Sequence, residues 1–463
     1  MNDCSVLFIE NNKIMVFTDD SNDLLCLFFE DEQRIISSQK QVDASPKVFR
    51  PYISGFDFDK DGPIKFMQSN VGTIKKRLAF LGIDNDYVRE NFNTIVSGLL
   101  LELAAGNIIQ GRLNKLAIGE QISLLQELDF NDWLGSTWGK VGTRSSQNLE
   151  IYESLNLDFL IKEPLGILYC ILQKYDDDND LIFDVTEQYY TDIDYSVKFD
   201  RRSDSNPFAY KDRFTIITEG NTDSSILNTC FSLIHPELKG YLTFFDFEST
   251  NLGGGTGNLA NLVKAFIGLK ITDEIIALFD NDTAAHEATI EFSKLNFPNN
   301  ICVVYLPFDP NLSAYPCIGV NGIEFIQANG IAASIELFLG ESCLSNENHN
   351  LYPIVLNGFS SKTNTYQGSL KEKAKVFAKF TSYLSSQDKE RIVRDSDIDL
   401  IFKMISNIIR VRNNEVRRSR TSDLNYGYYF ASLVAPGSVH IQFRNLNPTK
   451  QGDDQKEREI IEL

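Results

Sequence analysis

The sequence lacks the cysteine spacing that metal cages and disulfide frameworks require. Its seven cysteines include no CxxC pair, and their number is odd. They stand at positions 4, 26, 170, 230, 302, 317 and 343. This pattern argues against a cysteine zinc site and predicts reduced thiols, as in a cytosolic protein. No basic start followed by a long apolar run opens the chain, so we expect no secretory signal and a cytoplasmic location.

Long hydrophobic runs are missing as well. No stretch reaches the roughly 18 apolar residues of a membrane-spanning helix. The richest segment runs from Val96 to Ile109 and is interrupted by Glu102 and Asn107. We therefore expect no contact with a membrane.

Several motifs of well-known enzymes are also absent. The sequence has no HExxH, no GxSxG and no GK[ST] after a glycine-rich loop, which argues against zincins, α/β-hydrolases and P-loop ATPases. A glycine-rich segment, Gly253 to Gly257, does join a predicted strand to a predicted helix. It fits equally a flexible active-site loop and a plain tight connection.

Positive charge is scarce over the whole chain. Against 64 acidic residues stand only 44 Lys and Arg, so the net charge is -20. A polyanion binds nucleic acid poorly, because phosphate contacts need positive surface. Any nucleic-acid binding must therefore use a local basic patch, or metal ions that screen the acidic groups.

The chain of 463 residues is long enough for about three domains. Two short strands, 5–9 and 13–17, are predicted on either side of a hairpin signal, and Leu24 to Glu30 is a third candidate. Apolar residues recur at helical spacing from about residue 86, and the run 84–86 (DND) can cap the start of this helix. Further helices are expected to about residue 175.

Residues 212–308 follow a different pattern. Short runs rich in β-branched and aromatic residues alternate with helical segments, in the order βαβαβαβ. The expected strands are 214–218, 241–247, 275–279 and 301–306, and the expected helices are 224–234, 258–269 and 284–293. This order predicts an α/β fold with a mostly parallel sheet and helices on both of its faces.

Acidic residues follow two of these strands directly. Glu219 ends the first, and Asp280 and Asp282 end the third as an Asp-x-Asp pair. The carboxyl ends of parallel strands share one edge of the sheet, so these side chains are expected to meet there. Crowded carboxylates repel one another unless a cation lies between them, and oxygen ligands favour Mg²⁺ or Mn²⁺. A single such motif would be read as a strand-ending turn, but two in this order favour a metal site.

The segments 216–223 (IITEGNTD) and 276–282 (IALFDND) together resemble the Toprim domain, which topoisomerases, primases and the OLD class of nucleases share. The resemblance covers roughly residues 212–380. It implies that Glu219 is an acid–base residue that also contacts metal, that Asp280 and Asp282 are metal ligands, and that Asp223 supports them.

The same resemblance extends to two later positions. The segment 334–338 (SIELF) resembles an acidic helix of the nuclease branch, which makes Glu336 a candidate metal ligand; an exposed helical glutamate is the alternative. The segment 366–373 lies where that branch keeps a catalytic lysine. We select Lys373 for this role, with Lys371 and Lys375 as competitors.

The flanking regions resemble the HEPN/Toprim-associated proteins of prokaryotes, which are mostly presumed phage-defence effectors. The resemblance rests on 25–31 (LCLFFED) and 71–82 (VGTIKKRLAFLG), and on Arg412-Asn413, which begins the RNxxxH pattern of HEPN ribonucleases. Arg417 replaces the acid–base histidine, so a helical, structural HEPN-like region is expected. The expected divisions are 1–110 (N-terminal, α+β), 111–205 (helical), 212–380 (Toprim) and 381–463 (helical, HEPN-like).

One segment of the sequence is basic, although the chain as a whole is acidic. Residues 361–420 contain 14 Lys or Arg and seven Asp or Glu. Its arginines are candidate nucleic-acid contacts, with a solvated helix face as the equal alternative and, for Arg412, structural packing as a further one. They are Arg410, Arg412, Arg417, Arg418 and Arg420.

These observations predict a Mg²⁺- or Mn²⁺-dependent Toprim nuclease that cleaves DNA or RNA as an effector of anti-phage defence. The alternative is a non-catalytic sensor or scaffold subunit that binds metal or nucleotide. Nucleic acid is the expected partner, together with a partner protein or a second copy of the chain. A topoisomerase is disfavoured because no active-site tyrosine can be assigned, and a primase because its zinc module is absent.

Overall fold

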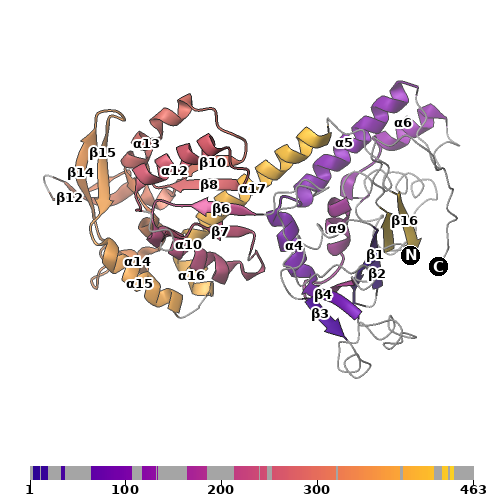
Figure 1. Ribbon diagram of the computed structural model, residues 1–463, viewed down its shortest axis with the longest axis horizontal. Helices are drawn as coiled ribbons and strands as arrows, with labels where there is room; N and C mark the ends of the chain where they lie inside the picture. The colour runs from indigo at the N-terminus through magenta and orange to yellow at the C-terminus, as the bar shows by residue number, and fades with distance from the viewer. Residues whose placement is uncertain are drawn as a thin grey trace. The chain divides into compact units, whose positions relative to one another are not determined.

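The computed structural model divides the chain into two compact units (Figure 1). The first comprises Met1–Ala79, Ile83–Ala209 and Val416–Leu463, and the second comprises Phe80–Gly82 and Tyr210–Glu415. The residues that the structure describes are 4–10, 12–18, 33–36, 64–106, 117–131, 133, 164–184, 213–238, 240–247, 253–319, 322–385, 389–421, 430–435 and 438–442.

The first unit contains a seven-stranded sheet. Its order is β16-β17-β2-β1-β5-β4-β3, and its pairs are antiparallel except for β17 with β2. The strands are β1 (Cys4–Ile9), β2 (Asn12–Thr18), β3 (Gln33–Ile36), β4 (Ile64–Asn70), β5 (Asp180–Asp184), β16 (Phe430–Ala435) and β17 (Ser438–Gln442). The predicted N-terminal hairpin is confirmed as β1 and β2. The third candidate, Leu24 to Glu30, lies outside the described residues.

Two predictions for this unit are wrong in part. The region 111–205 is not wholly helical, because β5 lies in the centre of the sheet between β1 and β4. Its three buried apolar residues, 181–183, are too short a run to stand out in the sequence. The region 381–463 is not wholly helical either, since β16 and β17 pair as antiparallel strands; in the sequence a Pro-Gly turn signal stands between them.

The described helices of the first unit include α4 (Val71–Phe80), α5 (Asn85–Ala104), α6 (Ile118–Gln126) and α9 (Pro164–Leu172). The predicted start of α5 is confirmed, because the Asp84 side chain accepts a hydrogen bond from the Tyr87 amide at 2.9 Å. Within the described ranges of the whole chain, no helix combines the length and the apolar character needed to cross a bilayer.

The second unit contains the predicted parallel sheet. Its order is β10-β8-β6-β7, and all three pairs are parallel. The strands are β6 (Phe214–Ile217), β7 (Leu242–Phe244), β8 (Glu274–Phe279) and β10 (Ile301–Tyr305). The connecting helices are α10 (Asn221–Ile234), α12 (Thr256–Leu269) and α13 (Thr283–Thr289), with η5 (Ile290–Lys294) after α13. The α/β prediction for this region is confirmed.

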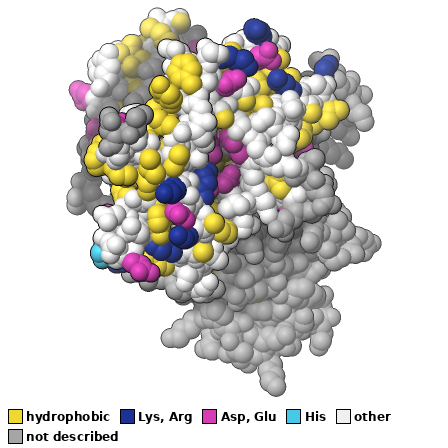
Figure 2. Space-filling view, turned by 90° about the vertical axis from the view of Figure 1, so that its left-hand side faces the viewer, with side chains coloured by type: hydrophobic (Ala, Val, Ile, Leu, Met, Phe, Trp, Pro, Cys, Tyr) yellow, Lys and Arg dark blue, Asp and Glu magenta, His cyan; other side chains and the backbone are white. Residues whose placement is uncertain are grey.

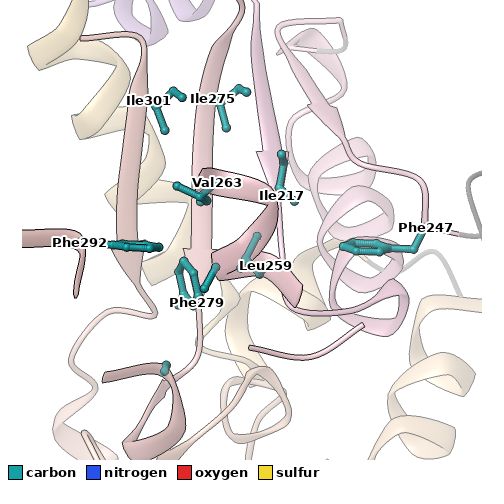
Figure 3. Packing of buried hydrophobic residues seen from close by; sticks show 11 residues of the cluster. Ile217, Phe247, Leu259, Val263, Ile275, Phe279, Phe292 and Ile301 are labelled. Atoms are coloured by element: carbon teal, nitrogen blue, oxygen red, sulfur yellow. The ribbon is translucent and has the colours of Figure 1, made fainter. Parts of the chain in front are cut away.

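The strand order reverses direction between β6 and β8. From β6 the chain passes to β7 on one side, then returns past β6 to β8 on the other side. Right-handed crossovers place α10 on one face of the sheet and α12 and α13 on the opposite face. Figure 3 shows the core on the α12 face, where Val263 packs near Ile275 and Leu259 near Ile217. The point of reversal is where α/β sheets open toward a ligand, at the carboxyl ends of the strands.

Smaller elements complete the second unit. A four-stranded sheet has the order β12-β11-β14-β15, and β13 pairs with β9. The strands are β9 (Asn281–Asp282), β11 (Tyr315–Gly319), β12 (Gly322–Ile326), β13 (Ala332–Ala333), β14 (Ile354–Ser360) and β15 (Thr365–Leu370). The helical segments are η4 (Pro236–Leu238), η6 (Pro310–Ala314), η7 (Ile335–Phe338), α14 (Glu341–Leu344), α15 (Lys373–Ser385), α16 (Lys389–Asp395) and α17 (Ile398–Thr421).

Gly340 lies between the start of α14 and the end of α16 and should not tolerate a side chain. It precedes α14 with φ +91, and a Cβ atom there would collide with the backbone carbonyl oxygen of Asp395. We expect Gly340→Ala to lower the free energy of unfolding by at least about 3 kcal/mol, because both backbone strain and a backbone clash oppose it.

The test is denaturant unfolding, with Gly268→Ala as the control. Gly268 lies in α12 with no atom within 4 Å of a Cβ, so its replacement should raise stability by about 0.5 kcal/mol. The expected loss in the free energy of unfolding is about 3 kcal/mol. A loss of less than about 1 kcal/mol in Gly340→Ala would contradict the close packing of this segment.

Candidate metal centre

Glu219 lies at the point where the strand order reverses, just after β6. Its Oε1 accepts a hydrogen bond from the Asp280 backbone amide at 3.0 Å, and its Oε2 accepts one from the Thr256 hydroxyl. The register of β6 with β8 pairs Ile217 with Ala277, which places the ends of the two strands side by side. The predicted meeting of Glu219 with the Asp-x-Asp segment is therefore present in the geometry.

The glycine-rich segment closes tightly against Glu219. The Gly255 amide donates to the Glu219 carbonyl oxygen at 2.6 Å, and a Cβ atom on Gly254 would lie 2.9 Å from that same oxygen. Of the two interpretations of this segment, the contacts of its described part favour the tight connection. The sequence does not mark Thr256 as a site residue, since its only signal is its position at the start of a helix after glycines.

Asp282 has two structural partners. Its Oδ1 accepts from the Ala285 amide at 2.8 Å and caps α13, while its Oδ2 accepts from Gln367 Nε2 at 2.9 Å. Gln367 comes from β15, about 85 residues along the chain, and no local pattern marked it. The Gln367 Oε1 atom is buried and has no hydrogen-bond partner among the described residues.

Glu336 reaches the cluster through strand pairing. Ala332 and Ala333 of β13 pair with Asp282 and Asn281 of β9, which brings the following turn, η7, against the Asp-x-Asp segment. Glu336 is only 8% exposed, so its alternative interpretation as an exposed helical glutamate is wrong. Its Oε2 accepts a hydrogen bond from the Ser334 hydroxyl at 2.6 Å.

Lys373 is the cation of this cluster. Lys373 is the first residue of α15, and its Nζ atom lies 3.2 Å from Glu336 Oε2. Of its two competitors, Lys371 is exposed and Lys375 pairs with Glu372 at 3.2 Å. The contacts therefore favour Lys373 among the three lysines.

The carboxyl groups of the cluster perturb one another. Burial raises the pKa of Asp223 to about 7, and the charges of Glu336 and Glu219 add to the rise. Burial raises the pKa of Asp280 well above its ordinary value, and Glu219 and Asp223 act in the same direction. Burial also raises the pKa of Glu219, against the hydrogen bonds that it accepts. These groups are therefore a site where negative charge is costly unless a cation is present.

Lys373 responds in the opposite way. Burial acts to lower its pKa, but the carboxylates of Glu336, Asp280 and Asp223 outweigh that effect and raise the pKa above the ordinary lysine value. The ammonium group therefore stays charged at neutral pH and partly neutralises the cluster. Figure 2 shows acidic side chains gathered near the middle of the face that it presents, with basic side chains beside them.

The donor set fits a hard divalent cation. All its candidate ligands are oxygens, burial and neighbouring carboxylates raise the pKa values of Glu219, Asp223 and Asp280, and the unpartnered Gln367 Oε1 lies beside Asp282. Among the described residues, no three acidic, histidine or cysteine side chains already converge as ligands of one ion do. Asp282 caps α13, and Glu336 pairs with Lys373.

The arginine candidates lie on α17. Arg412 is largely buried, and its guanidinium pairs with Glu274 Oε2 at 3.3 Å; the next residue, Asn413, donates to the Leu81 carbonyl oxygen at 3.2 Å. These contacts favour a packing role for Arg412 over a phosphate contact. The side chain of Arg410 packs against Gly82. The side chains of Arg417, Arg418 and Arg420 lie outside those that the structure describes.

We expect Arg412→Ala to destabilise the protein rather than only to weaken nucleic-acid binding. It would remove a partner from Glu274, which is 7% exposed, at a cost on the order of 3 kcal/mol. The double variant Arg412→Met, Glu274→Met should recover much of that loss. Denaturant unfolding measures both. The control is Lys403→Met, which breaks an exposed pair with Asp399 and should cost less than about 0.5 kcal/mol. Equal midpoints for Arg412→Ala and Lys403→Met would contradict the packing role.

No protein family, curated protein or solved structure was found to match this chain. Its function must therefore be argued from the site itself.

Proposed function

We propose that this chain is a Mg²⁺- or Mn²⁺-dependent nuclease of the Toprim type that hydrolyses phosphodiester bonds in DNA or RNA. The observation that supports it most is the hydrogen-bonded pair Glu219 and Asp280 at the reversal point of a parallel sheet, with Lys373 as the counter-charge. Carboxylate side chains at the carboxyl edge of such a sheet, with a lysine beside them, can stabilise the charges that develop when a phosphate ester is cleaved.

Each residue would have a distinct task. Asp280 and Asp282 would hold the cation, with Glu219 beside it and Asp223 and Glu336 as further oxygen donors. When bound, the cation supplies Lewis-acid polarisation of the phosphate and lowers the pKa of water. The carboxyl group of Glu219, whose pKa burial raises, would accept or return a proton at its Oε atoms. The Lys373 ammonium would stabilise negative charge on the phosphate oxygens in the transition state.

We further propose that this activity serves prokaryotic anti-phage defence, as the resemblance to HEPN/Toprim-associated proteins implies. Phages should form fewer plaques on cells that produce the wild-type chain than on cells that produce an Asp280→Asn variant. Equal plaque counts for the two would count against a defence role and leave the nuclease proposal standing.

A cleavage assay tests the nuclease proposal directly. Purified chain is incubated with supercoiled plasmid and with tRNA, in Mg²⁺, in Mn²⁺ and in EDTA. We expect cleavage of at least one substrate in either metal and none in EDTA. Binding of Mn²⁺ without cleavage of plasmid or tRNA would instead favour the alternative, a metal-binding sensor or scaffold subunit of a defence complex.

A further inference from the structure

A pair of aspartates stands in the second unit outside the candidate metal centre. The first, Asp309, lies in the loop after β10 and precedes η6, where its Oδ1 atom accepts a hydrogen bond from the Asn311 amide at 2.8 Å. The Asn329 side chain holds the Asp309 backbone: its Oδ1 accepts from the Asp309 amide at 3.0 Å, and its Nδ2 donates to the Asp309 carbonyl oxygen at 2.9 Å. Asp309 is therefore fixed in place, and it is only 1% exposed.

The other oxygen of the Asp309 carboxyl group is not satisfied in this way. Asp309 Oδ2 is buried, and among the described residues no hydrogen-bond donor reaches it. Burial raises the pKa of Asp309, against the hydrogen bond from the Asn311 amide, because an ionised carboxylate loses its hydration there. Buried polar atoms are nearly always paired, so an unpaired oxygen in so fixed a side chain indicates a ligand that supplies the missing contact.

Asp397 brings a second carboxyl group to the same place. It directly precedes α17, and its backbone amide donates to the Phe338 carbonyl oxygen at 2.9 Å. Burial raises the pKa of Asp397, and the charge of Asp309 adds to the rise. Asn311 links the two aspartates, since its amide binds Asp309 and its side chain forms a hydrogen bond with the carboxyl group of Asp397.

No basic side chain balances this pair. Within the part of the chain that the structure describes, no Lys, Arg or His forms an ion pair with either Asp309 or Asp397. The two hydrogen bonds from Asn311 favour ionised carboxylates, which repel each other unless a cation lies between them. Asp397 is half-buried and Asn311 is exposed, so the pair is open to water and ions on that side.

We infer that Asp309, through its unpaired Oδ2, and Asp397 together bind a divalent cation of the Ca²⁺ type, which ties the loop after β10 to the start of α17. Carboxylate oxygens from two separate segments, with water to complete the shell, suit Ca²⁺, which accepts an irregular arrangement of oxygen ligands. With only two carboxylates, the dissociation constant should be roughly 10⁻⁴ to 10⁻³ M, in the range of the weaker calcium sites. This site shares no ligand with the candidate metal centre and does not rest on the proposed function.

Calorimetric titration of the full chain with Ca²⁺ tests this inference. The parent protein carries Asp280→Asn and Asp282→Asn, so that the candidate metal centre does not contribute to the binding. We expect one Ca²⁺ ion to bind per chain. About 10 mM Ca²⁺ should raise the thermal midpoint in the same protein by about 3 °C or more, and potassium chloride of equal ionic strength should not.

Two variants and a control locate the ion. Asp309→Asn preserves the shape of the side chain, and its amide group replaces the unpaired oxygen with a donor that faces a carboxylate. We expect it to be at least as stable as the parent in EDTA. Asp309→Asn and Asp397→Asn should each weaken Ca²⁺ binding by about 10-fold or more. Asp273→Asn removes the same charge from an exposed position and should keep the full response, so it measures the general attraction of Ca²⁺ to an acidic chain.

Three results would overturn the calcium site. They are no Ca²⁺ binding by the parent, equal Ca²⁺ affinities in Asp309→Asn, Asp397→Asn and Asp273→Asn, and a lowered midpoint of Asp309→Asn in EDTA. A proton shared by the two carboxyl groups would give the first result, together with a midpoint that falls as the pH rises in the parent more steeply than in Asp309→Asn. None of these measurements uses cleavage, so a failure of the nuclease proposal leaves the calcium site standing, and the reverse holds as well.

Discussion

Replacing Asp280 with asparagine should abolish metal-dependent cleavage and, at the same time, stabilise the metal-free protein. The loss of activity should be about 10³-fold or more, the scale of about 4 kcal/mol of lost transition-state stabilisation. The gain in stability follows from the pKa of Asp280, which burial and the neighbouring carboxylates Glu219 and Asp223 raise. A residue that weakens the fold while it supports activity is typical of a functional site.

A carboxyl group whose folded-state pKa is raised contributes stability that is fully present below its unfolded pKa, near 4, and is lost as the pH rises through the folded value. At pH 8 the Asp280 carboxylate therefore costs stability, and the uncharged amide of asparagine avoids that cost. In EDTA, the thermal midpoint of Asp280→Asn should exceed that of wild type at pH 8, and the two should converge toward pH 4.

The control for Asp280→Asn is Asp273→Asn, an exposed aspartate just before β8. It should change neither the cleavage rate nor the midpoint. The expected loss is about 10³-fold. If Asp280→Asn cleaves at more than one tenth of the wild-type rate, Asp280 is not part of the proposed centre. A lowered midpoint in EDTA would show that its carboxylate is a structural contact instead.

Replacing Lys373 with methionine should have the opposite effect on stability. Its raised pKa means that the stabilisation it supplies is complete below about pH 10 and is lost only as the pH rises through the folded value. Without it, Glu336, Asp280 and Asp223 lose their counter-charge. The cost at pH 8 should be about 1–2 kcal/mol, less than for a fully buried pair, because the Lys373 side chain is 42% exposed and water screens it.

Two measurements separate this role from simple packing. The loss of stability in Lys373→Met should shrink at pH 5, because Asp223, whose pKa is about 7, is then largely protonated. Mn²⁺ should restore part of the midpoint, since a bound cation takes over the neutralising role, while cleavage stays at least about 10²-fold below wild type. Lys371→Met, an exposed neighbour, should behave as wild type. A pH-independent loss that Mn²⁺ does not reverse would contradict the electrostatic role.

The sequence supplied the frame of the second unit and part of its site. Alternating short strands and helices between 212 and 308 predicted the parallel sheet, since strand and helix periodicities are local. Glu219 and Asp280 could be placed together because the carboxyl ends of parallel strands share an edge. Both inferences use general geometry and need no knowledge of distant contacts.

The missed parts depend on contacts between distant segments. Gln367 reaches Asp282 only because β15 lies beside α13, and Glu336 is buried only because β13 pairs with β9. The sequence could not decide between a phosphate contact and packing for Arg412, because its partner, Glu274, lies 138 residues away. The strand β5 and the hairpin β16–β17 were missed because short apolar runs are ambiguous until the sheet that they complete is known.

Calorimetric titration with Mn²⁺ at pH 7, repeated in two buffers of different ionisation enthalpy, tests the central claim most directly. The wild-type chain should bind Mn²⁺ and release protons, because the carboxyl group of Asp223, whose pKa is about 7, is partly protonated before the ion arrives, and burial raises the pKa of Asp280 in the same direction. The observed heat should therefore differ between the buffers. Glu219→Gln should still bind, whereas a double variant, Asp280→Asn with Asp282→Asn, should not. Wild-type affinity for Mn²⁺ in that double variant, or no Mn²⁺ binding by the wild-type chain, would contradict a metal centre at this edge of the sheet.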